Sequence, residues 1–75
     1  MEFEKIREVI SEQMGVNADR ITMETSFAKD LGADSLDVFQ IISELEDIFD
    51  LDFSNEDAEK IVTVGDAVAF IQNAR

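Results

Sequence analysis

The chain contains no cysteine, proline, histidine, tryptophan or tyrosine among its 75 residues. The lack of cysteine excludes disulfides, thiolate metal sites and cysteine nucleophiles. It also means that cysteine usage gives no information about the redox compartment. The lack of histidine removes the usual general base for an activated serine. Basic residues are also scarce: 6 lysines and arginines stand against 18 aspartates and glutamates, for a net charge of −12. Nucleic acids and anionic membranes are therefore poor partners, and basic protein surfaces are good ones.

Long apolar runs, a signal peptide and an arginine-rich transit segment are missing as well. We therefore expect no stable membrane insertion, and a cytoplasmic protein or one whose targeting peptide has been removed. The apolar fraction of 45% is enough for a small core, so the chain is expected to fold. A chain this short cannot divide its core, which predicts a single domain over residues 1–75, expected to be a monomer.

Helical spacing marks the first part of the chain. Apolar residues recur every three or four positions over residues 2–14, and Gly15 follows as a left-handed cap. Residues 16–34 lack clean periodicity and predict a long ordered loop, of a length that usually has a functional reason. The loop's apolar residues are predicted to plug the core: Val16, Ile21, Phe27 and Leu31.

Three further helices follow. A central helix is predicted over residues 35–49, which contain neither glycine nor proline. Two hydroxyl residues that each precede a carboxylate by three positions, Ser54 and Thr63, predict helix starts. They open a short helix near 55–60 and a last one near 64–74, whose predicted core stripe is Val64, Ala67, Val68 and Ile71. Together these features predict an all-α fold, a bundle of four helices with one short helix and a long first loop.

The central helix divides into faces at about 100° per residue. One arc is apolar and predicted to face the core: Val38, Ile41, Ile42, Leu45, Ile48 and Phe49. Another is predicted to be solvated: Asp37, Gln40, Glu44 and Asp47. Leu36 and Phe39 belong to neither arc, so they either touch the long loop or form an apolar contact patch beside Ser35. Every charged residue between Lys29 and Lys60 is acidic, which favours steering toward basic partners over a merely solvated face.

Ser35, in 31-LGADSLD-37, begins the central helix between two aspartates. As an enzyme nucleophile it is improbable, because the chain offers no histidine and Lys29 lies six residues upstream. A catalytic pair of carboxylates is equally doubtful in a chain with so little room for a desolvated pocket. Two readings remain. Either Ser35 or Asp34 merely caps the helix, or Ser35 receives a phosphate-linked group from another enzyme, in the favourable field of the unpaired N–H groups.

The segment 31-LGADSLD-37, the acidic helix after it and 56-EDAEKIVTV-64 closely resemble the acyl carrier proteins of fatty acid synthesis. The resemblance spans essentially the whole chain. It implies that Ser35 carries 4′-phosphopantetheine, transferred from coenzyme A by a phosphopantetheinyl transferase that requires magnesium, with Asp34 and Leu36 beside it in the cofactor site. Acyl chains would be bound as thioesters to the terminal thiol of this arm. The protein would then be a carrier on which partner enzymes act, not an enzyme.

The resemblance also implies a docking surface for the basic patches of fatty acid synthesis enzymes. Its electrostatic contacts would be Asp34, Asp37, Glu46 and Asp47, and its apolar contacts Leu36 and Phe39. An acyl pocket is implied at Ile42, Leu45, Phe49, Ile61 and Ala67.

The chain departs from the family pattern at several positions of that surface. Gln40, which still belongs to the docking set, stands where relatives commonly have glutamate, and Ser43 where they commonly have an apolar residue. Phe39 is bulkier than the valine often found there. Ser54 replaces a proline that often opens the third helix, and it is itself a competent cap.

Two alternatives stay open. One is a carrier with the same arm and a different cargo: polyketide, peptidyl or D-alanyl. The other is a small acidic scaffold or divalent-cation-binding protein without a prosthetic group. An EF-hand loop starting at Asp50 fails, because Asn55 and Ile61 stand where glycine and an acid are needed. No specific metal site is expected, although weak divalent binding remains plausible at Glu46, Asp47, Asp50 and Asp52.

Overall fold

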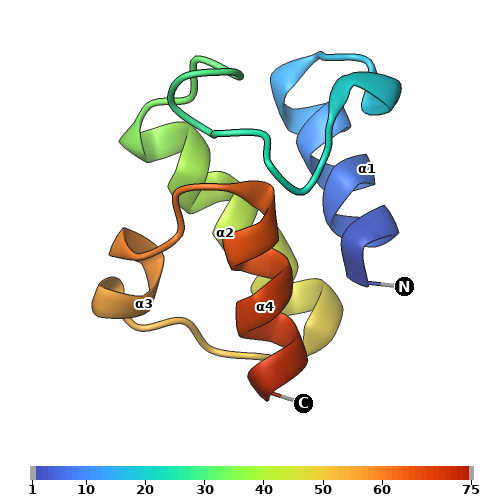
Figure 1. Cartoon of the computed structure of the whole chain (residues 1–75). Helices are drawn as coiled ribbons and strands as arrows, with labels where there is room; N and C mark the ends of the chain where they lie inside the picture. The colour runs from blue at the N-terminus through green and yellow to red at the C-terminus, as the bar shows by residue number, and fades with distance from the viewer. Residues whose placement is uncertain (1, 75) are drawn as a thin grey trace.

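The structure is a computed structural model that describes residues 2–74, and it confirms the all-α expectation. Its elements, in order, are α1 (Glu2–Met14), a 3-10 helix η1 (Ala18–Arg20), α2 (Ser35–Phe49), α3 (Asn55–Glu59) and α4 (Val64–Ala74) (Figure 1). The first, central and last helices have their predicted bounds. The short helix ends at Glu59, one residue early, and η1 was not predicted. None of the helices in the described part of the chain is both long and apolar enough to cross a lipid bilayer.

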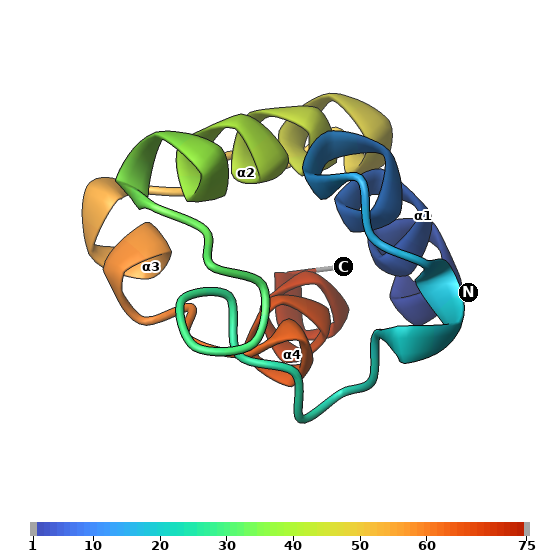
Figure 2. The ribbon, with the colours of Figure 1, turned by 90° about the horizontal axis from the view of Figure 1, so that it is seen from above.

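Three helices enclose the core. α1 packs against both α2 and α4, and Figure 2 shows α3 on the side between α2 and α4. The largest fully buried side chains come from these three helices and the long loop: Ile6, Ile10, Ile21, Ile41, Leu45, Val64 and Ile71. Each stabilises the fold by about 1.5–3 kcal/mol relative to an exposed position. Truncation of one, such as Ile10→Ala, is expected to cost about 2–5 kcal/mol, a large part of the stability of a small domain.

Most core predictions are confirmed. The α4 stripe is buried, Ile21 and Phe27 plug the core from the loop, and Val16 and Leu31 pack partly buried against it. Ile48 was predicted to be in the core, and this is wrong, because its side chain is 40% exposed. The physical reason is its position at the edge of the apolar arc, one residue before the end of α2.

Helix ends follow the local sequence. Gly15 has a φ of 69°, and its N–H donates to Ser11 O at 2.9 Å, which closes α1. Asp50 closes α2 in the left-handed region with a φ of 55°, a conformation that aspartate tolerates better than most residues. Ser54 caps α3 and forms a capping box with Asp57, as its spacing predicted.

Main-chain hydrogen bonds tie the long loop to the start of α4. The N–H groups of Val64 and Gly65 donate to the carbonyl oxygens of Thr25 (3.0 Å) and Met23 (2.8 Å). A side chain at Gly65 would place Cβ 2.9 Å from Met23 O, so this approach requires glycine. The loop then turns back, with the N–H of Ala33 donating to Phe27 O at 2.8 Å, and it ends at the start of α2, where Ser35 lies.

Candidate functional site

Asp34, rather than Ser35, caps α2. Its Oδ1 accepts from the N–H of Asp37 at 2.9 Å, and Asp37 Oδ2 accepts from the N–H of Asp34 at 3.3 Å. This reciprocal capping box satisfies the helix start without Ser35. Ser35 occupies the first helical position with an exposed side chain, and its hydroxyl has no hydrogen-bond partner within residues 2–74. The hydroxyl of Ser35 is therefore exposed and not used in capping the helix.

The start of α2 also offers unpaired main-chain donors. In any α-helix the first N–H groups have no partner one turn back. The N–H groups of Ser35 and Leu36 find no acceptor elsewhere in the described chain. Together with the dipole of this 15-residue helix, they favour an anion attached at the first turn.

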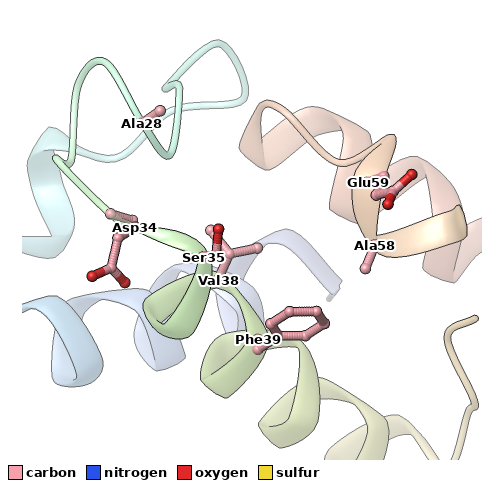
Figure 3. A pocket seen from close by; sticks show the side chains of 8 residues that line it. Ala28, Asp34, Ser35, Val38, Phe39, Ala58 and Glu59 are labelled. Atoms are coloured by element: carbon pink, nitrogen blue, oxygen red, sulfur yellow. The ribbon is translucent and has the colours of Figure 1, made fainter. Parts of the chain in front are cut away.

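Beside Ser35 lies a hollow of about 250 Å³. Its lining comes from the long loop, α2 and α3: Ala28, Ala33, Asp34, Ser35, Val38, Phe39, Ala58 and Glu59. Figure 3 shows the Ser35 oxygen directed toward the space between the loop and α3, and the Phe39 ring directed toward Ala58. The Asp34 carboxylate points to the other side. Small alanine side chains from the loop and from α3 leave this space open.

Leu36 and Phe39 favour the contact-patch reading. Leu36 is 71% exposed and Phe39 52% exposed, although Phe39 also shares the hollow with Ala28 of the loop. Two large apolar side chains are thus partly or largely exposed within the first five residues of α2. Such exposure beside a free functional group is typical of a protein-contact surface.

The acidic residues predicted to dock partners lie along α2, and several also bind the chain itself. Asp34 and Asp37 form the capping box, and Glu46 Oε2 accepts from the N–H of Phe53 at 2.8 Å. Asp47 is exposed and Glu46 is half-buried. Gln40, also exposed, accepts a hydrogen bond from Gln13 Nε2 of α1, a partner that the sequence analysis did not anticipate.

The residues predicted for an acyl pocket do not line the hollow. Ile42, Leu45, Ile61 and Ala67 are buried in the core cluster, and Phe49 packs partly buried against it. That pocket therefore stays a prediction and would require the core side chains to separate. The lining that the structure has was not predicted, because residues from separate segments carry no recognisable signal in the sequence: Ala28, Ala33, Val38, Ala58 and Glu59.

The acidic side chains of the described residues were compared with the arrangement that a metal ion needs. No group of three carboxylates within residues 2–74 is placed to hold a metal ion, including the cluster around Asp50. The pKa of Asp66 is lowered by the backbone N–H groups of Thr63 and Val62, and this carboxylate lies at the start of α4, outside the hollow.

Comparisons with known proteins agree with this geometry. The family model described as "Phosphopantetheine attachment site" matches residues 4–71. An acyl carrier protein from Enterococcus faecalis, noted for high thermal stability, is 40% identical, with 99% of this chain and 94% of the other covered and a TM-score of 0.85. A candidate acyl carrier protein from Mycobacterium tuberculosis is 39% identical over 100% of both chains, with a TM-score of 0.91.

Proposed function

The chain belongs to the acyl carrier protein family, and on that premise we propose that it carries acyl intermediates of fatty acid synthesis on a 4′-phosphopantetheine arm attached to Ser35. The observation that carries the proposal is the division of roles at the start of α2. Asp34 caps the helix, which leaves the exposed Ser35 hydroxyl unbonded at the mouth of an apolar hollow.

The attachment is a phosphoryl-group transfer from coenzyme A. Ser35 Oγ forms a bond to the phosphorus that bears pantetheine, the bond from that phosphorus to the bridging oxygen breaks, and adenosine 3′,5′-bisphosphate leaves. The serine proton goes to a base of the transferase, since this chain has no histidine. The unpaired N–H groups of Ser35 and Leu36 would provide a favourable environment for the negative charge of a phosphodiester attached at Ser35.

The residues present fit the arm. The prosthetic group supplies the thiol on which acyl thioesters form, which this cysteine-free chain lacks. Val38, Phe39 and Ala58 give the hollow apolar walls against which an arm or a short acyl chain can pack away from water. Glu59 adds one exposed carboxylate residue of α3 to this lining.

Partners would recognise α2. Asp34, Leu36, Asp37, Phe39, Gln40, Glu46 and Asp47 form the proposed docking set, facing basic patches on a phosphopantetheinyl transferase and on fatty acid synthesis enzymes. A net charge of −12 speeds encounter with such patches, and the gain falls as salt rises. We predict that the protein is a monomer and that it acts in the cytoplasm.

The test is the intact mass of the apo protein before and after incubation with coenzyme A, Mg²⁺ and a broad-specificity phosphopantetheinyl transferase. Wild type is expected to gain the mass of one phosphopantetheine, and Ser35→Ala to gain nothing. Ser43→Ala is the matched control, because Ser43 is another exposed serine of α2 and its loss should leave loading intact.

The opposite result would be equally informative. If wild type gained no mass while a known carrier was modified in the same reaction, Ser35 would not be an attachment site. The acidic scaffold would then become the leading interpretation. Loading of fatty acyl, polyketide, peptidyl or D-alanyl groups onto the modified protein, by transferases specific for each, would decide the cargo.

A further inference from the structure

The side of α2 that faces α3 is marked by residues that recur every three or four positions: Ser35, Phe39, Ile42 and Glu46. Both ends of this line meet α3 or the segment that leads into it. Ser35 lines the hollow together with Ala58 of α3. Glu46 Oε2 accepts from the N–H of Phe53, one residue before the cap of α3, at 2.8 Å. The line therefore follows the boundary between the two helices, called the α2–α3 seam below.

Phe39 divides this seam into an open part and a closed part. Its ring is directed toward Ala58 (Figure 3), and both residues line the hollow that begins at Ser35. Three residues further along α2, Ile42 is buried in the core cluster, and so is Ile61, three residues after Ala58. Neither isoleucine lines the hollow. The open space therefore lies on the Ser35 side of the Phe39 ring, and core side chains fill the seam beyond it.

The bulk of the Phe39 side chain is not needed to fill the core. Phe39 is 52% exposed and does not belong to the core cluster. Its truncation would therefore enlarge the hollow and leave the buried side chains in contact with one another. Opposite the ring, Ala58 contributes only a methyl group from α3. The end of the hollow that lies toward Ile42 is thus closed mainly by the ring of Phe39.

We propose that Phe39 determines how long an acyl group this chain can shelter. The arm on Ser35 places a short acyl group in the hollow, and the ring stops a longer one at the entrance to the closed part of the seam. Methylene groups inside the hollow leave water and stabilise the folded protein, whereas those stopped by the ring remain in solvent and add nothing. This inference rests on the proposed function, because its occupant is the acyl group of the chain's own arm.

The first readout is the melting temperature of the acylated protein. Samples that carry acetyl, butanoyl, hexanoyl, octanoyl or decanoyl groups are prepared from the corresponding acyl-coenzyme A and the transferase, and intact mass verifies that each is fully loaded. Each methylene group that becomes buried is expected to raise the melting temperature by about 3 °C. No partner enzyme takes part in the melting measurement, so a loss of docking contacts at Phe39 does not affect it.

In wild type the rise in melting temperature, relative to the acetyl form of the same protein, should stop early in this series. In Phe39→Ala it should continue to longer acyl groups, and Phe39→Val, which keeps a branched side chain, should lie between the two. Ile48→Ala is the matched control, because Ile48 is another exposed apolar residue of α2 and does not line the hollow. This variant is expected to follow the wild-type series.

The second readout uses the protein without its arm. Xenon is a small apolar probe that binds in apolar cavities. Nuclear magnetic resonance under xenon pressure reports, through methyl signals, which side chains the probe reaches. The methyl signals of Ile42 and Ile61 should shift in Phe39→Ala and stay unchanged in wild type and in Ile48→Ala, because only the first variant opens the hollow toward them.

The same dependence on acyl length in wild type and Phe39→Ala, or a wild-type rise that continues through decanoyl, would overturn the role of Phe39 and leave the carrier function standing. An equal xenon response of Ile42 in wild type and Phe39→Ala would also overturn it. Absence of loading, in a reaction that modifies a known carrier, would refute the carrier function and with it the acyl occupant. The xenon response then decides separately whether the ring closes the seam.

Discussion

At the scale of single residues, an aspartate at the third position closes the start of α2, α3 and α4 alike. Asp37, Asp57 and Asp66 accept from the backbone N–H groups of the respective caps, at 3.3, 3.1 and 3.0 Å. Asp66 accepts a second such bond from Val62 at 3.0 Å, and its pKa is lowered below the ordinary 3.8. In α2 this arrangement has a functional consequence, because a helix capped by two aspartates does not need the serine between them.

The lowered pKa of Asp66 predicts a pH-dependent contribution to stability. The contribution is fully present above the unfolded value of 3.8, and it is lost as pH falls through the lower folded pKa. At pH 7, Asp66→Asn is expected to lower the melting temperature by about 4 °C, the shift that loss of roughly 1 kcal/mol of capping free energy gives in a small domain. The difference in melting temperature between the variant and wild type should disappear in strong acid.

Thermal unfolding of both proteins across this pH range measures the effect. Asp47→Asn is the control, since Asp47 is exposed and is not one of the capping residues. A gap for Asp66→Asn that persists unchanged in strong acid would contradict the assignment.

At the scale of elements, α3 is the one most weakly held. It has only five residues, too few to be stable alone, and none of them is fully buried. Its neighbours hold it in place: Phe53 stacks on Phe70 of α4 with ring centroids 4.2 Å apart, and the N–H of Phe53 donates to Glu46 of α2. Since α3 forms one wall of the hollow through Ala58 and Glu59, its opening would admit or release an arm.

Amides of α3 are accordingly expected to exchange hydrogen with solvent faster than those of α2. Glu46→Ala should speed this exchange about fivefold further, because it removes a hydrogen bond worth on the order of 1 kcal/mol. Glu46→Gln keeps an acceptor oxygen and should behave nearly as wild type. Hydrogen exchange resolved by residue is the measurement, and equal protection of α3 and α2 in wild type would sink this prediction.

The elements that the sequence predicted well are those with local signals. Gly15, Ser54 and Thr63 marked helix boundaries because caps act within a few residues, and the structure has all three boundaries. The 3-10 helix was missed although Asn17 caps it by accepting from the N–H of Asp19, a turn signal within a loop read only for its apolar residues. Ile48 was wrongly predicted to be buried, because periodicity shows which side of a helix is apolar but not how far along the helix other elements cover that side.

The site was predictable only in part, for the same reason. Ser35 and its flanking aspartates are contiguous in sequence, so their position at a helix start could be derived. The hollow depends on Ala28 and Ala58 approaching across 30 residues, which only the tertiary structure brings about. The Gln13–Gln40 contact between α1 and α2 is equally non-local. Chemistry at one position could be inferred from the sequence, whereas the space around it could not.

At the scale of the whole molecule, charge opposes folding. The molecule measures 27 × 25 × 19 Å along its principal axes, and it carries a net charge of −12. At low ionic strength the Debye length of about 30 Å exceeds the size of the molecule, so every acidic residue repels every other, whereas at physiological salt it falls to about 8 Å. The same charge that attracts basic partners therefore costs stability when the protein is free.

Raising NaCl from low to physiological concentration is expected to raise the melting temperature by about 5 °C, as screening relieves this repulsion. A variant with Asp47→Asn and Asp52→Asn should have a higher melting temperature at low salt and a smaller increase with NaCl, since both positions are exposed and the substitutions reduce the net negative charge. Thermal unfolding by circular dichroism at several salt concentrations gives both slopes. A melting temperature that is constant or falls with NaCl would show that self-repulsion does not limit this fold.

The most direct measurement of the central claim is to locate the added group on the loaded protein. Fragmentation mass spectrometry of wild type, after reaction with coenzyme A and the transferase, should place one phosphopantetheine on the hydroxyl of Ser35 and leave every other serine and threonine unmodified. The group on another hydroxyl, or no group in a reaction that loads a known carrier, would contradict the account.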